Sequence, residues 1–128
     1  MKKSERGEIL NTVLGDHWPR FFAHRGASTL APENTLASFA LARKLGSRGV
    51  EFDVHQARTG ELVVAHDHWL DRVAAHHLKI EDLSYAELSD IDIGSFFSRT
   101  HPEIAEGSFA GGPFSGERIP TLDMVLET

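Results

Sequence analysis

The chain has 128 residues, of which 41% are hydrophobic and 25% are charged, with a formal net charge of −6 and no cysteine. This length fits about one small domain, and the composition is that of a globular protein without a large disordered region. The negative charge argues against a nucleic-acid partner, the lack of cysteine excludes disulfides and thiolate zinc sites, and no run approaches the ~18 apolar residues of a transmembrane segment. Residues 1–20 contain no continuous apolar segment typical of a secretory signal, so we expect a cytoplasmic protein.

The N-terminal half predicts a short amphipathic helix at 5–14, followed by a strand, a helix and a second strand. Residues 20–24 form the first predicted strand. The clearest helix spans 34–46, where Asn34 is a good N-cap, an apolar stripe follows and a glycine ends the pattern. The second strand covers 49–55. A strand, a helix and a strand within about 35 residues indicate a βαβ unit with parallel strands.

A third strand is predicted at 61–66, after the turn Arg58-Thr59-Gly60. Too few residues separate it from the second strand for a helical crossover. Two connections remain open: an extended crossover without a helix, or a locally antiparallel pair. We favour the extended crossover.

Residues 68–118 differ in character from the strands before them. The sequence Ser84-Tyr85-Ala86-Glu87 is a capping-box pattern, which predicts a short helix through about residue 90. The stretch 94–116 is rich in Gly, Ser, Phe and Pro without a clear period, so we expect an irregular segment there. A last helix begins at Pro120, with Thr121 as a cap.

The strand at 49–55 carries two acids close together. Because successive side chains of a strand point to opposite faces, Glu51, Asp53 and His55 share one face. Two neighbouring carboxylates repel each other and are costly on a buried face unless something neutralises them. Hard divalent cations prefer carboxylate oxygens, so the pair indicates a metal site. The alternative is an exposed edge strand with a solvated polar face.

Each of the three predicted strands brings polar groups to its C-terminal end: His24 and Arg25, then Glu51 and Asp53, then His66. In parallel α/β architectures, sites form at those ends. Two histidines suit general acid–base catalysis near neutral pH, and an adjacent arginine suits an anion, above all a phosphate. The residues therefore predict phosphoester chemistry.

The sequence resembles the glycerophosphodiester phosphodiesterase family, within the wider group of phospholipase-C-like phosphodiesterases. The resemblance lies in five blocks in the family's order: His24-Arg25-Gly26, Ala31-Pro32-Glu33-Asn34-Thr35, Gly49-Val50-Glu51-Phe52-Asp53-Val54, Thr59-Gly60-Glu61-Leu62-Val63-Val64-Ala65-His66-Asp67 and Ile119-Pro120-Thr121-Leu122. It implies an α/β fold, the N-terminal part of a (β/α)8 TIM barrel that this chain leaves incomplete. Residues 1–128 would form a single partial domain, with an N-terminal extension at 1–19 and a small irregular insertion at 68–118, after the third strand.

The resemblance also implies roles for the residues at the strand ends. His24 and His66 look like the catalytic pair, one deprotonating the nucleophile and the other protonating the departing alcohol. Arg25 looks like the arginine that binds the substrate phosphate. Glu51 and Asp53 look like ligands of a divalent metal ion, Mg²⁺ or Ca²⁺, which polarises the phosphoryl oxygens.

Other residues are assigned smaller roles. Glu33 looks like an acid that supports the site from behind, and Asn34 is chiefly a helix cap, with a site role as the alternative. We expect His55 to lie at the rim of the site rather than to bind the metal. His68, His76 and His77 are expected in a solvated loop, and the aromatic residues of the insertion are expected to pack against the barrel.

The function that the resemblance implies is metal-dependent hydrolysis of glycerophosphodiesters to an alcohol and sn-glycerol 3-phosphate. Alternatives are a lysophospholipase-D-type reaction, a non-catalytic module that binds phosphate and metal, and a purely structural half barrel. The family takes a third carboxylate ligand from a strand that would lie beyond Thr128, so we expect this chain to be the N-terminal half of an enzyme. An open half barrel is expected to self-associate or to pair with a C-terminal half.

Overall fold

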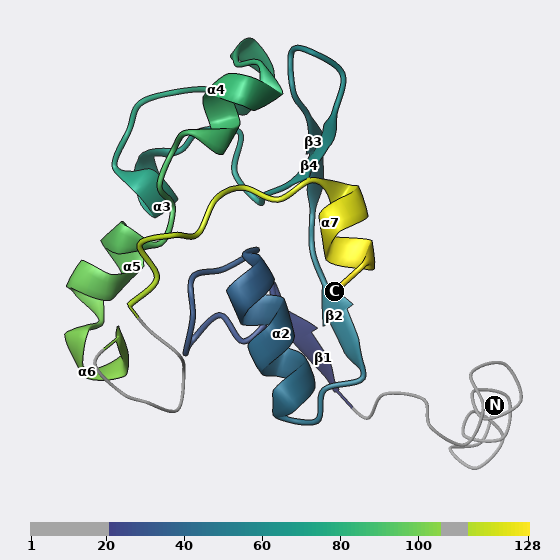
Figure 1. The fold of residues 1–128 in the computed structure, drawn as a ribbon, viewed down its shortest axis with the longest axis vertical. Helices are drawn as coiled ribbons and strands as arrows, with labels where there is room; N and C mark the ends of the chain where they lie inside the picture. The colour runs from purple at the N-terminus through teal and green to yellow at the C-terminus, as the bar shows by residue number, and fades with distance from the viewer. Residues whose placement is uncertain (1–20, 106–112) are drawn as a thin grey trace, which may run out of the picture.

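The computed structural model describes residues 21–105 and 113–128 (Figure 1). The helix predicted at 5–14 and the N-terminal extension at 1–19 lie outside the described residues. No helix in the described part of the chain is long and apolar enough to cross a membrane.

The predicted βαβ unit is present. Strand β1 (Phe22–His24) pairs in parallel with β2 (Gly49–Glu51), and helix α2 (Leu36–Lys44) connects them, lying beside both strands in Figure 1. The register aligns the last residues of the two strands, His24 with Glu51. Parallel pairing is thus confirmed, and it brings the two candidate site residues to the same edge of the sheet.

The N-cap of α2 is Thr35 and not Asn34 as predicted. Thr35 has the extended backbone of a cap, and its Oγ1 accepts a hydrogen bond from the Ser38 amide at 3.1 Å. Asn34 instead has a left-handed backbone with φ of 56°, which takes its side chain away from the first turn. Gly46, at φ of 89°, follows the C-cap as expected.

The strand predicted at 49–55 is interrupted at residues 52–53. Its second part, β3 (Val54–Gln56), pairs in antiparallel fashion with β4 (Leu62–Val64). The favoured extended crossover is therefore wrong, and β4 is not a third parallel strand. The connection is a tight turn in which the Gly60 amide donates to the Ala57 carbonyl at 2.9 Å, and so short a turn can join only antiparallel strands.

The chain after β4 folds into short helices: α3 (Asp71–Ala74), the 3₁₀ turn η1 (Ile80–Asp82), α4 (Tyr85–Ser89), α5 (Ser95–Thr100) and α6 (Pro102–Ala105). The capping box at Ser84 and Glu87 is confirmed. The irregular segment predicted at 94–116 is wrong for 95–105, where two helices form. Helix α7 (Leu122–Leu126) begins after Thr121, whose side chain accepts from the Met124 amide, as predicted.

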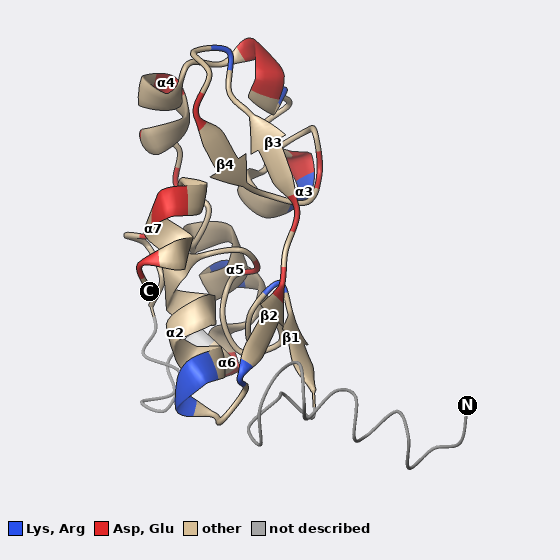
Figure 2. Cartoon of the chain, turned by 90° about the vertical axis from the view of Figure 1, so that its right-hand side faces the viewer, with Lys and Arg blue, Asp and Glu red and all other residues tan. Residues whose placement is uncertain are grey.

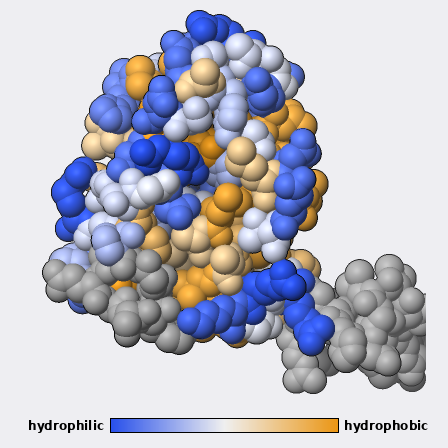
Figure 3. All heavy atoms as spheres, viewed as in Figure 1, coloured by the Kyte–Doolittle hydropathy of each residue, from blue (hydrophilic) through white to orange (hydrophobic). Residues whose placement is uncertain are grey.

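Of three buried clusters in the described residues, two fix these elements around the strand ends. The larger joins the β3–β4 hairpin to the short helices through Val63, Leu70, Ile80, Leu88 and Ile119, each at most 2% exposed. The other packs Phe39 of α2 and Val125 of α7 against Val64, with Val50 and Phe52 alongside. Hydrophobic side chains also reach the surface below a hydrophilic band in Figure 3. The hairpin and the βαβ unit are thus held together by a shared apolar layer.

Candidate active site

His24 and Glu51 form the first part of the site, at the aligned ends of β1 and β2. His24 Nε2 lies 3.5 Å from Glu51 Oε2, and the two side chains are 65% and 47% exposed. The Arg25 amide donates to the Glu51 carbonyl at 2.8 Å, which continues the ladder by one residue. So exposed a pair contributes little to stability, and its side chains are open to a ligand from solvent.

Arg25 and Glu33 form the second part, in the loop between β1 and α2. One guanidinium nitrogen of Arg25 lies 3.3 Å and 3.4 Å from the two Glu33 carboxylate oxygens, and both side chains are only 17% exposed. Arg25 has a left-handed backbone with φ of 57°, and its carbonyl accepts from the Asn34 amide at 2.9 Å. The tight loop thus turns Arg25 back toward Glu33.

Arg72 of α3 connects this pair to His66. Its guanidinium donates to both oxygens of Glu33, at 2.6 Å and 2.7 Å, and to Asp67 Oδ2 at 2.8 Å. Asp67 Oδ1 in turn lies 2.6 Å from His66 Nδ1. A continuous chain of charged contacts therefore runs from the β1 loop to the residues after β4.

These contacts shift the pKa values of both carboxyl groups. Hydrogen bonding from Arg72 is the main cause that lowers the pKa of Asp67 to about 2 from 3.8. Burial acts to raise the pKa of Glu33, but the hydrogen bonds and charges of Arg72 and Arg25 together outweigh it and lower that pKa. Both acids therefore stay ionised at neutral pH.

Arg72 was not predicted as a site residue. It lies within the insertion predicted at 68–118, and no motif marks it. A single arginine after a loop carries no sequence signal, and its partner Glu33 lies 39 residues away.

Asp53 lies between β2 and β3, on a link where acidic residues are visible in Figure 2. Its carbonyl accepts from the Ala65 amide at 3.1 Å, which ties it to the segment just before His66. No side chain in 21–105 or 113–128 bonds its carboxylate, whereas Glu51 has the histidine contact described above. Hard divalent ions prefer carboxylate oxygens as ligands, and few positive groups neutralise these two carboxylates. The residues present therefore fit such an ion.

Asn34 has no hydrogen-bond partner on either side-chain polar atom among the described residues, although it is 3% exposed. Asn34 lines a narrow pocket together with Glu33, His66 and Asp67, and apolar residues form the remaining walls. Since buried amides are normally satisfied, this one supports the site role that was the alternative to capping.

A cluster of two imidazoles and one carboxylate lies where no metal ligands were expected. Among residues 21–105 and 113–128, one group of three, His55, His68 and Glu81, has donor atoms close enough to hold a metal ion, all within 4.8 Å of one another. The His55 side chain is only 11% exposed, less than expected of a rim residue. The His68 side chain is 64% exposed in a loop, as expected, and also contacts Glu81. The predicted strand pattern placed His55 beside Asp53, but the break at 52–53 redirects it toward η1.

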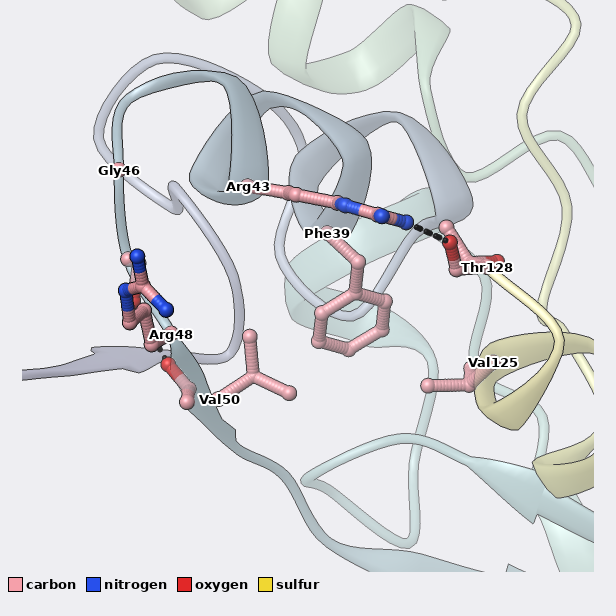
Figure 4. A pocket seen from close by; sticks show the side chains of 9 residues that line it. Phe39, Arg43, Gly46, Arg48, Val50, Val125 and Thr128 are labelled. Carbon is pink, nitrogen blue, oxygen red and sulfur yellow. Dashed lines mark hydrogen bonds between the residues drawn. The ribbon is translucent and has the colours of Figure 1, made fainter. Parts of the chain in front are cut away.

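A larger pocket of about 570 Å³ lies elsewhere, between α2, the start of β2 and α7 (Figure 4). Phe39, Val50 and Val125 form its apolar walls, and Arg43 crosses above them to donate to the Thr128 carbonyl at 3.0 Å. It lies at the N-terminal end of β2, opposite the end that carries Glu51. None of the candidate site residues lines it, so we do not assign the active site to it.

Comparisons with known proteins agree with the motifs. The model of the "Glycerophosphoryl diester phosphodiesterase family" matches residues 24–128. A glycerophosphodiester phosphodiesterase of Caldanaerobacter subterraneus is 40% identical over 105 residues, which cover 82% of this chain and 38% of the relative. The chain therefore spans less than two fifths of the length of that relative.

Solved structures give the same result. An Oleispira antarctica phosphodiesterase in complex with the product sn-glycerol-3-phosphate is 38% identical, with a TM-score of 0.69, over 85% of this chain and 39% of that one. A glycerophosphodiester phosphodiesterase from Agrobacterium tumefaciens is 32% identical, with a TM-score of 0.71, and the match covers 86% of this chain and 42% of that one. With the family model matched from His24 to the last residue, this chain belongs to the glycerophosphoryl diester phosphodiesterase family.

Proposed function

We propose that the protein hydrolyses glycerophosphodiesters to an alcohol and sn-glycerol 3-phosphate. The observation that carries this proposal is the pairing of His24 with Glu51 at the aligned ends of two parallel strands, beside Arg25. The likeness to the Oleispira phosphodiesterase, which holds sn-glycerol-3-phosphate, supports the choice of substrate class. The chain would then form part of a (β/α)8 barrel, with 68–118 inserted into it.

In the proposed reaction, one of His24 and His66 takes a proton from water or from a hydroxyl of the substrate, whose oxygen then bonds to phosphorus. The other histidine gives a proton to the alcohol oxygen as its bond to phosphorus breaks. The carboxylates Glu51 and Asp67, at 3.5 Å and 2.6 Å from the imidazoles, hold the two rings in orientation.

Arg25 is suited to bind the substrate phosphate. Glu33 is held more closely by Arg72, at 2.6 Å and 2.7 Å, than by Arg25, at 3.3 Å and 3.4 Å. Since Glu33 keeps a strong partner when Arg25 leaves it, the guanidinium of Arg25 can turn to a phosphate at small cost. Arg72 in this arrangement is a positioning residue.

Glu51 and Asp53 are the residues that would hold a divalent ion, Mg²⁺ or Ca²⁺. When bound, such an ion polarises phosphoryl oxygens and offsets the negative charge that develops on them. On this chain, the half-buried Asp53 carboxylate and the exposed Glu51 carboxylate would supply the oxygens.

The experiment that tests the proposal is hydrolysis of glycerophosphocholine, with Mg²⁺ or Ca²⁺ and with a chelator, by the wild-type chain, His24→Ala and His77→Ala. His77 is the matched control because it is 77% exposed and its imidazole is also paired with a carboxylate, Asp71, at 3.0 Å. We expect metal-dependent turnover that is lost in His24→Ala and kept in His77→Ala. Equal activity in all three chains would refute the assignment of His24.

A second candidate substrate is a lysophospholipid. Trp69 is 43% exposed and borders the pocket that also contains His66, so an apolar surface for one acyl chain lies beside the site. Lysophosphatidylcholine in the same assay separates the two, because only the second candidate predicts that Trp69→Ala weakens its hydrolysis more than that of glycerophosphocholine.

A further inference from the structure

His55, His68 and Glu81 converge on one point although they come from three segments. His55 lies in β3, His68 follows β4, and Glu81 is the middle residue of η1. The Nδ1 atoms of both histidines contact the same oxygen, Glu81 Oε1, at 3.0 Å for His55 and 2.5 Å for His68. The two rings meet edge to face, with centroids 4.6 Å apart.

The other nitrogen of His55 restricts how this contact can be made. His55 Nε2 lies 3.0 Å from the His66 carbonyl oxygen, which only accepts hydrogen bonds, so Nε2 carries the proton. In the neutral ring, Nδ1 then presents a lone pair to the Glu81 carboxylate. The contact between these two acceptors is then favourable only if a positive charge joins them, either a second proton on the ring or a metal ion. A metal ion satisfies both imidazoles and the carboxylate at once, and a histidine ligand commonly donates its second N–H to a carbonyl in this way.

The scaffold around the three side chains is already fixed. The Ile80 amide donates to the His68 carbonyl at 2.8 Å, which links two of the ligand segments directly. Ile80 itself is fully buried in the larger core cluster, so the residue before Glu81 is anchored. The second oxygen, Glu81 Oε2, is buried and has no hydrogen-bond partner. Binding would therefore require small side-chain movements rather than folding of the segment.

We propose that His55, His68 and Glu81 form a binding site for a zinc-class transition-metal ion, separate from the hard-ion ligands Glu51 and Asp53. Two imidazoles and one carboxylate suit Zn²⁺, whereas Mg²⁺ and Ca²⁺ take oxygen ligands. In a tetrahedral zinc site, ligand atoms lie roughly 3.3 Å apart, so the contacts of 3.0 Å and 2.5 Å need to open only slightly. His68 is 64% exposed, which leaves the fourth position open to solvent.

A metal ion bound at His55, His68 and Glu81 would affect the segment at His66 through a main-chain contact. The His66 carbonyl that His55 contacts belongs to a candidate catalytic histidine, so a metal ion at His55 would hold that segment in place. The proposal itself does not rest on the proposed hydrolase function, because it concerns binding alone.

The test is Zn²⁺ binding by the full chain, stripped of metal, measured by competition with a chromophoric chelator. Three variants accompany it: His68→Ala, His77→Ala and Asp53→Asn. We expect one Zn²⁺ per chain, unaffected by excess Mg²⁺, with affinity weakened about 100-fold or more in His68→Ala. Affinity should stay unchanged in His77→Ala, whose histidine has a carboxylate partner but no second imidazole, and in Asp53→Asn.

Visible absorption of bound Co²⁺ provides a readout that does not depend on activity. A spectrum of nitrogen and oxygen coordination that disappears in His68→Ala, while far-ultraviolet circular dichroism is unchanged, supports the site. Absence of stoichiometric binding by the wild-type chain, or binding lost in Asp53→Asn but kept in His68→Ala, overturns it. The three groups would then be a hydrogen-bonded cluster only.

Discussion

Replacing Arg72 by methionine removes the three hydrogen bonds that connect Glu33 to Asp67. Hydrogen bonds to charged groups contribute about 1.5–3 kcal/mol when buried, and exposed ion pairs about 0.2–1 kcal/mol. Arg72 is 47% exposed and Glu33 17%, which places this network between the two cases. The lowered pKa of Asp67, about 2 against 3.8, corresponds to ~2.4 kcal/mol before screening, and we halve it because solvent reaches both partners. We therefore expect Arg72→Met to lower the free energy of unfolding by about 1–2 kcal/mol.

Denaturant unfolding at neutral pH measures that loss, with Arg58→Met as the matched control. Arg58 also pairs with a glutamate, Glu87 at 3.2 Å, but both side chains are more than half exposed, so its loss should stay below about 0.5 kcal/mol. A carbon-detected NMR titration should in addition show the pKa of Asp67 rising toward 3.8 in Arg72→Met. Equal losses of unfolding free energy in the two variants, together with an unchanged pKa of Asp67, would contradict this explanation.

Three further outcomes follow from the same contacts. Because the pKa of Asp67 is lowered, the stability that its carboxylate contributes is fully present above pH 3.8 and is lost as the pH falls through about 2. The free energy of unfolding of Asp67→Asn, measured across that pH range, should therefore fall less than that of the wild type. Thr35→Ala should lower the free energy of unfolding, measured with denaturant, by about 1 kcal/mol, because Oγ1 caps α2 and also donates to the Pro32 carbonyl at 2.6 Å. Thr35→Ser should restore most of that loss. Gly26→Ala should lower the free energy of unfolding, measured in the same way, by about 2–4 kcal/mol, since φ is 82° and a Cβ would lie 2.8 Å from the backbone of Ser38. The control Gly116→Ala should be nearly neutral, because a Cβ there meets nothing within 4 Å.

What the sequence predicted well was set by short-range chemistry. The alignment of His24 with Glu51 follows from parallel pairing within one βαβ unit, and the cap at Ser84 follows from a four-residue pattern. Asn34 shows the limit of such patterns, because Asn34 and Thr35 are both good caps. Only the left-handed backbone of Asn34, imposed by the tight loop, decides between them.

The wrong predictions concerned geometry that depends on distant partners. A period of two continues through residues 49–55 in the sequence, so nothing local indicates the interruption that turns β3 away from β2. That interruption takes His55 out of line with Asp53 and brings it to Glu81, 26 residues later. Arg72 was missed for the same reason, since Glu33, which accepts two of its three hydrogen bonds, lies 39 residues away.

The short helices after β4 are therefore more than a covering of the strands. Through Arg72 they position two carboxylates that face His66 and Arg25, and through Glu81 they meet His55, whose ring contacts the His66 carbonyl. Both contacts end on the segment from His66 to His68. If the position of this segment controls turnover, then Arg72→Met and Zn²⁺ removal should each reduce activity without abolishing it, unlike His24→Ala. A combined variant, Arg72→Met and His68→Ala, should reduce activity by a larger factor than the product of the two single reductions. When one contact is lost, the other still restrains the segment, and the double variant removes both. Strictly multiplicative losses would mean that the two contacts act on independent parts of the site.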